Sequence, residues 1–411
     1  MAIRLSGGDE AYLSGERGAG GALAMRVLVR TAEAMGAERL LDISSVHVDG
    51  CLYHGQAGLD FVRTLVDGEA TVKVPTTLNV GALDLLHPEL VRLPSAERAA
   101  SRELMEAYVE LGCRPTWTCA PYQTASRPPM DSQIAWAESN AIVFANSVLG
   151  ARTERYGDFL DICAAITGRA PAVGLHLAEN RHPSIVVSVQ AVSTLCERED
   201  VTYPLIGHVL GRIVDTEVAL IRGLPAATTE DQLKALGAAA ASSGSVALFH
   251  AEGITPEARA GRFDGVASLP VVEVTQTMLE DAQRELTTLG SGQPDAVAMG
   301  TPHYSLRELE VLRAMVGERR CRLPIYVNVA RATLAEFGDR ATAELEQAGV
   351  RVVTDTCSYI TPILDPEATV VMTDSAKWAY YAPANLGVEV IFGSARACVE
   401  SAVEGRLVST W

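Results

Sequence analysis

The stretch DAVAMGTPHYSLRELEVLRAMVGERRCRLPIYVNV, residues 295–329, decides the fold class. Its apolar runs at residues 295–299 and 323–329 are separated by a helical pattern. The helix begins with a capping box, in which Ser305 and Glu308 satisfy backbone amides that would otherwise lack partners. A strand, a helix and a strand in this order are typical of parallel strands joined by a crossover helix. We therefore predict an α/β fold.

The same alternation continues toward the C-terminus. Further apolar runs lie at residues 350–353, 369–372 and 388–392, and helical patterns separate several of them. We predict a second capping box at residues 333–336, and a cap at Ser394 for a helix that runs through residue 407. Ligands of open parallel sheets bind beyond the carboxyl ends of the strands. The polar residues that follow the runs are therefore candidates for a site, namely 301–303, 355–358 and 373–377.

The rest of the chain has a weaker pattern. In the middle segment we predict helices over 204–221, after Thr229 and over 276–289, with strands over 246–249 and 271–274. In the first 200 residues we predict helices over 21–35, 96–111, 133–149 and 159–167, with strands over 40–43 and 70–74. The glycine cluster at 15–21 is interpreted as a flexible turn, and residues 291–294 as a domain boundary. The predicted domains are an N-terminal mixed α/β domain (1–203), a middle α/β domain (204–291) and a C-terminal parallel α/β domain (292–411).

Composition and charge restrict the partners. The 411 residues include 34 Lys+Arg and 51 Asp+Glu, which gives a formal net charge of −17, and 48% of them are hydrophobic. This balance indicates a globular protein with a sizeable core. Nucleic-acid phosphates and anionic membranes repel an acidic chain that has no basic run, so we expect neither as a partner.

Eight cysteines are spread along the chain, and the sequence has neither a signal-peptide pattern at its start nor a run of about 18 apolar residues. We therefore expect a cytoplasmic protein, in which the cysteines stay thiols. Each thiol is then a small buried hydrophobe, a metal ligand or a nucleophile. The sequence contains no P-loop, zinc-protease, serine-hydrolase or CxxC motif.

Four segments concentrate side chains that can bind metal, protons or a small polar substrate. They are LDISSVHVDGCLYHG (41–55), VPTTLNV (74–80), TWTCAPY (116–122) and DTCSY (355–359). Plainer alternatives stay open: a turn that buries Cys51, a capping turn around Thr77, and buried thiols at Cys119 and Cys357. Lys377 is a candidate to bind a substrate carboxylate. The alternative is that it lies on the solvated face of a helix.

The strings DGCLYHG, VPTTLNV, TCAPY, ESNAIVFANSVLGARTERYGDFLDICAAITGRAP, GTPHYSL, DTCSY and SAKWAYYAPANLGVEVIFG resemble the large subunit of aconitase X. This family is a divergent branch of the aconitase superfamily, and the likeness covers nearly the whole chain in one order. It implies a three-domain aconitase-like α/β/α core that lacks the swivelling fourth domain. It also implies an iron–sulfur dehydratase whose small subunit supplies that domain, together with a serine expected to be the catalytic base.

The resemblance assigns roles to individual residues. Cys119 and Cys357 match cluster ligands, and we predict Cys51 as the third, because Thr301 stands where the archaeal branch has a further cysteine. A 2Fe–2S cluster is favoured, with 3Fe–4S and 4Fe–4S as alternatives. The expected substrate-binding residues are Ser45, Val46, His47, Thr77, Asn79, Val80 and Lys377, and the expected catalytic residues on this chain are Lys377 and His47.

The predicted reaction is dehydration of a small hydroxy acid, with cis-3-hydroxy-L-proline favoured because DGCLYHG and VPTTLNVGALDLLHP have a bacterial character. The family's second activity, dehydration of 5-phosphomevalonate, is the first alternative. A cluster-free scaffold subunit and a thiol enzyme that uses Cys51 or Cys119 are the others. In the favoured mechanism Lys377 neutralises the substrate carboxylate and makes the α-proton more acidic.

Overall fold

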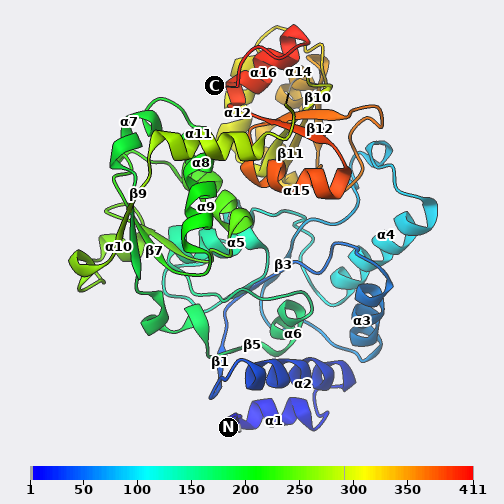
Figure 1. Ribbon diagram of the computed structural model, residues 1–411. Coiled ribbons are helices and arrows are strands. Elements are labelled where there is room, and N and C mark those ends of the chain that lie inside the picture. The colour runs from blue at the N-terminus through cyan, green and yellow to red at the C-terminus, as the bar shows by residue number, and fades with distance from the viewer. Residues whose placement is uncertain (1–2, 291, 411) are drawn as a thin grey trace. The chain divides into compact units, whose positions relative to one another are not determined.

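The computed structural model describes residues 3–290 and 292–410 (Figure 1), so the predicted domain limits at residues 1, 291 and 411 lie outside it. The chain forms two compact units. The first consists of the residues up to Leu83 and of Leu93–His182, and the second consists of Asp84–Arg92 and the residues from Pro183 onward. Among the described residues, no helix is long and apolar enough to cross a membrane.

The first unit surrounds a small parallel sheet with helices. The sheet has the order β3-β2-β4, and a separate antiparallel pair joins β1 to β5. The strands are β1 (Leu40–Asp42), β2 (Val46–Val48), β3 (Thr76–Leu78), β4 (Ala135–Trp136) and β5 (Arg169–Pro171). The helices are α1 (Gly7–Leu13), α2 (Ala19–Ala34), α3 (Gln56–Asp67), α4 (Ser95–Glu110), α5 (Ser139–Phe144), a π-helical continuation (Ala145–Leu149) and α6 (Leu160–Thr167).

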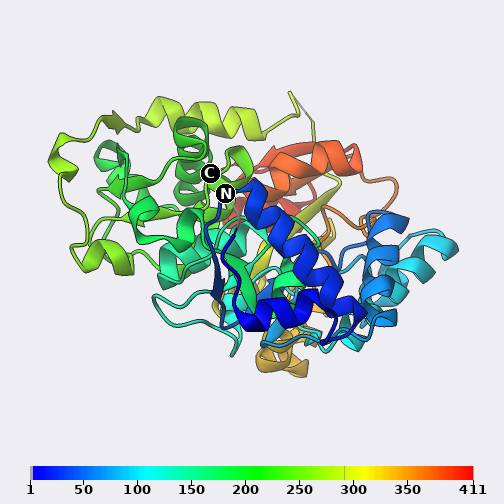
Figure 2. The ribbon, with the colours of Figure 1, turned by 90° about the horizontal axis from the view of Figure 1, so that it is seen from below.

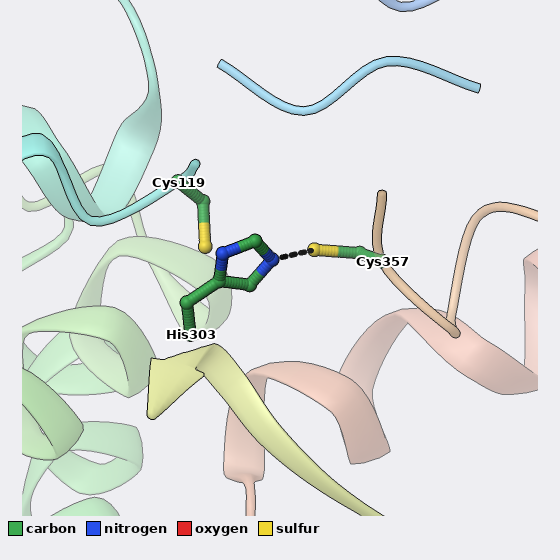
Figure 3. Close-up of side chains that lie close together, drawn as sticks. All are labelled: Cys119, His303 and Cys357. Carbon is green, nitrogen blue, oxygen red and sulfur yellow. Dashed lines mark hydrogen bonds between the residues drawn. The ribbon is translucent and has the colours of Figure 1, made fainter. Parts of the chain in front are cut away.

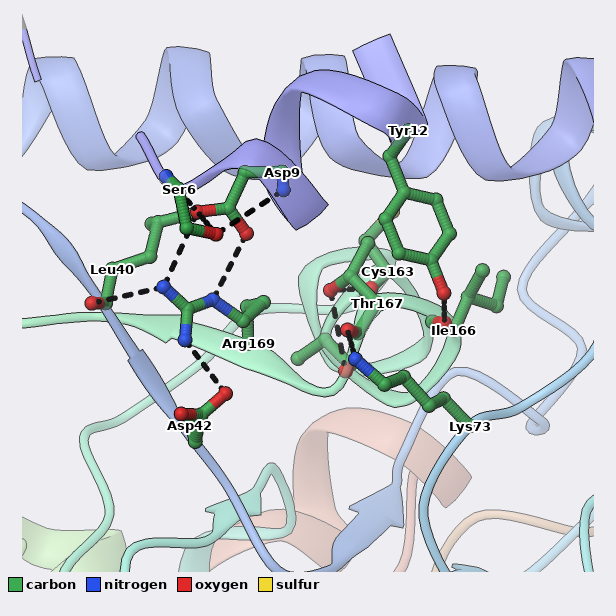
Figure 4. Close-up of polar contacts among 11 residues, drawn as sticks. Ser6, Asp9, Tyr12, Leu40, Asp42, Lys73, Cys163, Ile166, Thr167 and Arg169 are labelled. Carbon is green, nitrogen blue, oxygen red and sulfur yellow. Dashed lines mark hydrogen bonds and ion pairs between the residues drawn. The ribbon is translucent and has the colours of Figure 1, made fainter. Parts of the chain in front are cut away.

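Helices α1 and α2 lie side by side in both views (Figures 1 and 2). The partly buried guanidinium of Arg169 links α1 to the strand pair, because it contacts the buried Asp9 of α1 at 3.0 Å and the exposed Asp42 of β1 at 2.6 Å (Figure 4). On the other side of α1, the Tyr12 hydroxyl donates to the carbonyl of Ile166 at 2.9 Å. These contacts fix the N-terminal helix on the unit.

Three predictions for this unit are wrong. The segment 70–74 is not a strand, because its amides at Val72 and Lys73 donate to the carbonyls of Leu111 and Ala165, in and beside helices, and β3 follows it instead. The predicted helix 133–149 begins only at residue 139, after β4. The glycine cluster runs into α2, where Gly20 is required by packing, because a Cβ there would lie 2.6 Å from the carbonyl oxygen of Leu65.

The second unit contains two parallel sheets, with the strand orders β8-β7-β6-β9 and β12-β11-β10-β13-β14. The strands are β6 (Ile185–Ser188), β7 (Ala219–Arg222), β8 (Phe249–Ala251), β9 (Val271–Glu273), β10 (Ala296–Tyr304), β11 (Ile325–Val329), β12 (Val350–Val353), β13 (Val370–Thr373) and β14 (Glu389–Phe392). The helices are α7 (Ser193–Cys196), α8 (Thr202–Val214), α9 (Glu230–Ser243), α10 (Pro256–Arg259), α11 (Gln276–Leu286), α12 (Leu306–Val316), α13 (Arg331–Phe337), α14 (Asp339–Gln347), α15 (Ala376–Leu386) and α16 (Ala395–Glu404). Short 3-10 helices occupy Pro88–Leu90, Pro121–Gln123, Gly174–His176, Ala178–Arg181, Gln190–Val192 and Val266–Ser268 of the two units.

The predicted α/β class and all five C-terminal strands are confirmed, and those strands form one parallel sheet. Its core packs Val297 and Val327 of the sheet against Leu309 and Leu312 of α12. Burial of each such side chain contributes about 1.5–3 kcal/mol. The predicted caps at Ser305 and Ser394 are also confirmed.

Three predictions for the second unit need correction. The capping box at 333–336 is wrong, because α13 already begins at Arg331 and buries Thr333 inside it. The helix predicted over 204–221 ends at Val214, because Asp215 has a positive φ of 49° that a right-handed helix cannot continue, and 219–222 is a strand. The strand predicted over 246–249 begins three residues later, at Phe249.

Candidate active site

The first candidate segment forms the central strand of the small sheet. In β2, Val46 pairs with Thr76 and His47 with Thr77 of β3. The His47 Nδ1 atom lies 2.8 Å from the Thr77 hydroxyl, and the ring is fully buried. Burial lowers the pKa of His47 to about 3, so the imidazole is neutral at physiological pH. Ser45, directly before β2, is partly exposed.

Asp49, in the loop after β2, lies near desolvated carboxyl groups from other segments of the first unit. Asn79, at the end of the second candidate segment, donates a hydrogen bond from its Nδ2 atom to Oδ1 of Asp49. Asp161 accepts the backbone N–H of Asp49 at 2.7 Å. Burial raises the pKa of Asp49 to about 7, and the neighbouring carboxylates of Glu138 and Asp158 add to the effect. Burial, together with Asp158, raises the pKa of Asp161 to about 7 as well.

Cys51 lies in the same loop and is fully buried. Its Sγ atom is 3.3 Å from the carbonyl oxygen of Asn79 and 3.5 Å from that of Val80, so the thiol donates to backbone oxygens. Burial raises the pKa of the Cys51 thiol well above its usual value. Cys51 therefore contacts two of the predicted substrate-binding residues, Asn79 and Val80. Its role as a cluster ligand stays a prediction.

A buried polar network fixes the loop that carries Cys119. Asn140 donates from Nδ2 to the Cys119 carbonyl at 3.1 Å, and its Oδ1 accepts the Tyr122 hydroxyl at 2.6 Å. Glu138 accepts a second hydrogen bond from Asn140 and caps α5 through the amide of Ala141 at 2.9 Å. The polar residues that stand out in the apolar segment 133–149 therefore position the cysteine loop.

In the second unit, β10 carries His303, and Cys357 follows β12 in the loop at the carboxyl end of the sheet. The Nε2 atom of His303 lies 3.7 Å from Sγ of Cys357 (Figure 3). The same atom lies 3.2 Å from the carbonyl oxygen of Thr356. Burial, together with the ammonium groups of Lys234 and Lys377, lowers the pKa of His303 to about 4. The imidazole of His303 is therefore neutral at physiological pH, and it lies beside the buried thiol of Cys357. The third side chain in Figure 3, Cys119, belongs to the first unit.

Asn328 of β11 connects the strand that carries His303 with the loop that carries Cys357. Its Nδ2 atom donates to the Met299 carbonyl at 3.0 Å, to the Thr301 hydroxyl at 3.3 Å and to the Ser358 hydroxyl at 3.0 Å. Its Oδ1 atom accepts the Ser358 amide at 3.0 Å. Because Asn328 is fully buried, these contacts fix both loops in one arrangement.

Two lysines lie close to the same edge of the sheet. Lys377 is buried on α15 and lines a pocket together with Lys234, Thr301 and Ser375. Lys234 of α9 contacts the Glu308 carboxylate and donates to the His303 carbonyl at 3.4 Å. The ammonium group of Lys234 is paired with the carboxylates of Asp231 and Glu308, and Asp374 also lines the pocket, so the two lysines lie among acidic groups.

Sequence reasoning missed Asn328 and Lys234. Asn328 had a detectable signal, since it is the one amide side chain inside the apolar run IYVNV. Lys234 had none, because a lysine on a helix is normally solvated. Its burial follows from the approach of α12, whose Glu308 also completes the capping box at Ser305.

The donor atoms suit the expected cofactor. In the second unit, His303 and Cys357 are buried and lie next to each other, and Cys119 is a buried thiol of the first unit. Thiolate and imidazole are the protein ligands of iron–sulfur clusters. The residues present therefore fit an iron–sulfur group.

Three family models match the chain: aconitase X first domain over residues 2–179, second domain over 183–284 and third domain over 294–404. The chain is 42% identical over 413 residues to the cis-3-hydroxy-L-proline dehydratase of Pseudomonas aeruginosa, which covers 98% of this chain and 70% of that protein. It is 36% identical over 395 residues to the phosphomevalonate dehydratase large subunit of Methanothermobacter thermautotrophicus, covering 93% of this chain and 95% of that protein. The crystal structure of Thermococcus kodakaraensis aconitase X (holo-form) is similar with a TM-score of 0.88 and 32% identity, over 97% of this chain and 100% of that one.

Proposed function

The chain belongs to the aconitase X family, and we propose that it is the large subunit of a hydro-lyase that removes water from cis-3-hydroxy-L-proline. The observation that carries the proposal is the buried pair of His303 and Cys357 at the carboxyl edge of a parallel sheet, beside Lys377. The higher identity to a hydroxyproline dehydratase than to the phosphomevalonate relative supports the choice of substrate. Because several relatives are named large subunits, a small subunit is the proposed partner.

We propose that Cys119 and Cys357 are ligands of an iron–sulfur cluster, with 2Fe–2S as the favoured type. The cluster would supply a Lewis acid for the leaving hydroxyl group. The third ligand is either Cys51, as the sequence predicts, or His303, which lies beside Cys357. The thiol of Cys51 already has carbonyl partners, which favours His303.

The protein's own side chains prepare the substrate for loss of its α-proton. Lys377 pairs with the substrate carboxylate and neutralises its negative charge. The α-proton becomes more acidic, because the carbanion that forms when it leaves no longer lies next to an uncompensated negative charge. The neutral imidazole of His47, held by Thr77, offers a hydrogen bond to the substrate without adding charge. The small subunit supplies the base. When the α-proton and the hydroxyl leave as water, the product enamine tautomerises to a cyclic imine, which makes the step effectively irreversible.

The predicted division at residues 203 and 291 remains our proposal for the domains. We also propose that the enzyme works in the cytoplasm, because its eight cysteines are all free thiols, as is usual in a reducing compartment.

The decisive experiment is anaerobic co-expression with the candidate small subunit, followed by assays on cis-3-hydroxy-L-proline and 5-phosphomevalonate. We expect a brown complex that contains iron and acid-labile sulfide and dehydrates only the first compound. Cys357→Ser and Cys119→Ser should remove iron and activity, whereas Cys398→Ser, a buried cysteine on α16, should retain both.

Other outcomes would favour the other candidate functions. Activity on phosphomevalonate alone would reassign the substrate. Iron-free but active preparations that a thiol alkylator inactivates would favour a thiol enzyme. Full activity of both cysteine variants would favour a cluster-free scaffold.

A further inference from the structure

Two hydrogen-bond acceptors lie together in the first unit: Asp49 in the loop after β2 and Asn79 directly after β3. Their full capacity is not used among the described residues. Asn79 is 3% exposed, and its Oδ1 atom is buried with no hydrogen-bond partner. The orientation of this amide is fixed, because its Nδ2 atom faces the carboxylate of Asp49. Asp49 itself is partly exposed and can be reached by a small ligand. An unused amide oxygen and a carboxylate therefore lie next to each other.

The surroundings of Asp49 are negative. Its strongest charged neighbours are three carboxyl groups, those of Glu138, Asp158 and Asp161. Two of these are engaged elsewhere, since Glu138 caps α5 and Asp161 accepts backbone amides at the start of the loop. The free acceptors at Asp49 and Asn79 thus stand in a field that attracts a cation and repels an anion.

We propose that Asp49 and Asn79 bind the ammonium group of an amino-acid substrate. This inference rests on the proposed function and specifies how its substrate class is selected. A proline-type ring nitrogen is a secondary ammonium group with two N–H donors, and the site offers one carboxylate and one amide oxygen to receive them. A phosphate ester would bring negative charge to the same field and would be disfavoured.

The test compares two ligands of one shape on the complete enzyme with its small subunit. L-Proline carries the ring ammonium, whereas tetrahydrofuran-2-carboxylate of the same handedness has an uncharged oxygen in its place. Binding of each is measured by isothermal titration calorimetry, which does not depend on turnover. In Asp49→Asn we expect L-proline to bind about 10- to 100-fold more weakly, the usual effect of losing a hydrogen bond to a charged group, with little change for the oxygen analogue.

A matched control separates the direct contact of Asp49 with the ammonium group from the general effect of the surrounding negative charges. Asp158→Asn removes the same charge from the same group of carboxylates, so we expect only a small loss of L-proline binding. Equal losses in the two variants, or equal losses for the two ligands in Asp49→Asn, would overturn the proposal. If Asp49→Asn does not fold, as judged by its thermal melting, Asn79→Leu removes the amide acceptor and should weaken L-proline selectively.

Two further outcomes are decisive. Selective binding of Ca²⁺ or Na⁺ that disappears in Asp49→Asn would assign the site to a metal ion and would refute the ammonium proposal. The enzyme could also bind L-proline more tightly than the oxygen analogue, in a way that depends on Asp49, and yet not dehydrate hydroxyproline. That result would support the ammonium site and refute the proposed reaction.

Discussion

Replacement of Asn328 by alanine tests whether the two loops of the second unit are held by one side chain. Asn328 is fully buried, and the variant removes both polar atoms of its side chain. Its Oδ1 atom accepts the Ser358 amide, and its Nδ2 atom donates to Met299, Thr301 and Ser358. An unpaired buried amide costs about 1–3 kcal/mol, and each lost hydrogen bond contributes about 0.5–1.5 kcal/mol. We therefore expect the free energy of unfolding to fall by about 2–5 kcal/mol.

The same variant should loosen the proposed metal ligands, because Ser358 directly follows Cys357 and Thr301 lies two residues before His303. Residues that orient metal ligands typically change metal affinity about 10- to 100-fold when they are replaced. The assay is denaturant unfolding, together with the rate at which a chelator removes iron from the anaerobically purified complex. We expect a lower unfolding midpoint and faster iron loss.

The control is Asn180→Ala, which removes an exposed amide that donates to the Gly174 carbonyl at 3.0 Å in the first unit. It should leave both measurements unchanged. A loss of stability below about 0.5 kcal/mol in Asn328→Ala, within the range of ordinary surface substitutions, would refute the reasoning. So would unchanged iron retention in a clearly destabilised variant, because Asn328 would then support the fold without positioning the donors.

Three further perturbations have expected outcomes. Lys234→Met leaves the partly buried Glu308 carboxylate without the buried cation that pairs with it, so chemical denaturation should show a loss of up to about 3–5 kcal/mol, with partial recovery in Lys234→Arg. Equal stability of all three proteins would contradict this. Burial raises the pKa of Asp161 from 3.8 to about 7, so the folded state holds an extra proton between these values and loses stability as pH rises through that window. The side chain of Asp161→Asn cannot titrate, so the free energy of unfolding is compared with that of wild type at pH 5 and pH 8. We expect the stability of the variant relative to wild type to be about 1–3 kcal/mol higher at pH 8 than at pH 5. No such increase would contradict the raised pKa of Asp161. Gly20→Ala should lower the melting temperature, because overpacking costs about 1–3 kcal/mol, whereas Gly7→Ala, with open space around its Cβ position, should not; equal melting temperatures would refute the packing argument.

The C-terminal sheet was predictable because its strands are buried on both faces and therefore appear as continuous apolar runs between capped helices. The N-terminal sheet was not, because β2, β3 and β4 have only two or three residues each. At residues 70–74 the amides of Val72 and Lys73 bond to helix carbonyls, a tertiary arrangement that no local pattern encodes.

Reactive side chains are visible in the sequence where several types occur together, as in the segment that contains His47 and Cys51, and their roles stay predictions. Their partners were harder to find. Asn328 and Lys234 act from other elements, and their importance depends on burial that arises only after α9, α12 and β11 pack together. Local sequence therefore predicts the reactive side chains better than the residues that position them.

The two activities named among the relatives place different demands on one family. If the proposed roles of Cys119, Cys357 and Lys377 hold, these residues serve either substrate and do not by themselves separate the two activities. The substrates differ in the charge of the rest of the molecule, which is an ammonium group in hydroxyproline and a phosphate in phosphomevalonate. A carboxylate at Asp49 favours the first and repels the second. If Asp49 and Asn79 select the ammonium group, relatives that act on phosphomevalonate should carry an uncharged or basic residue at the position of Asp49.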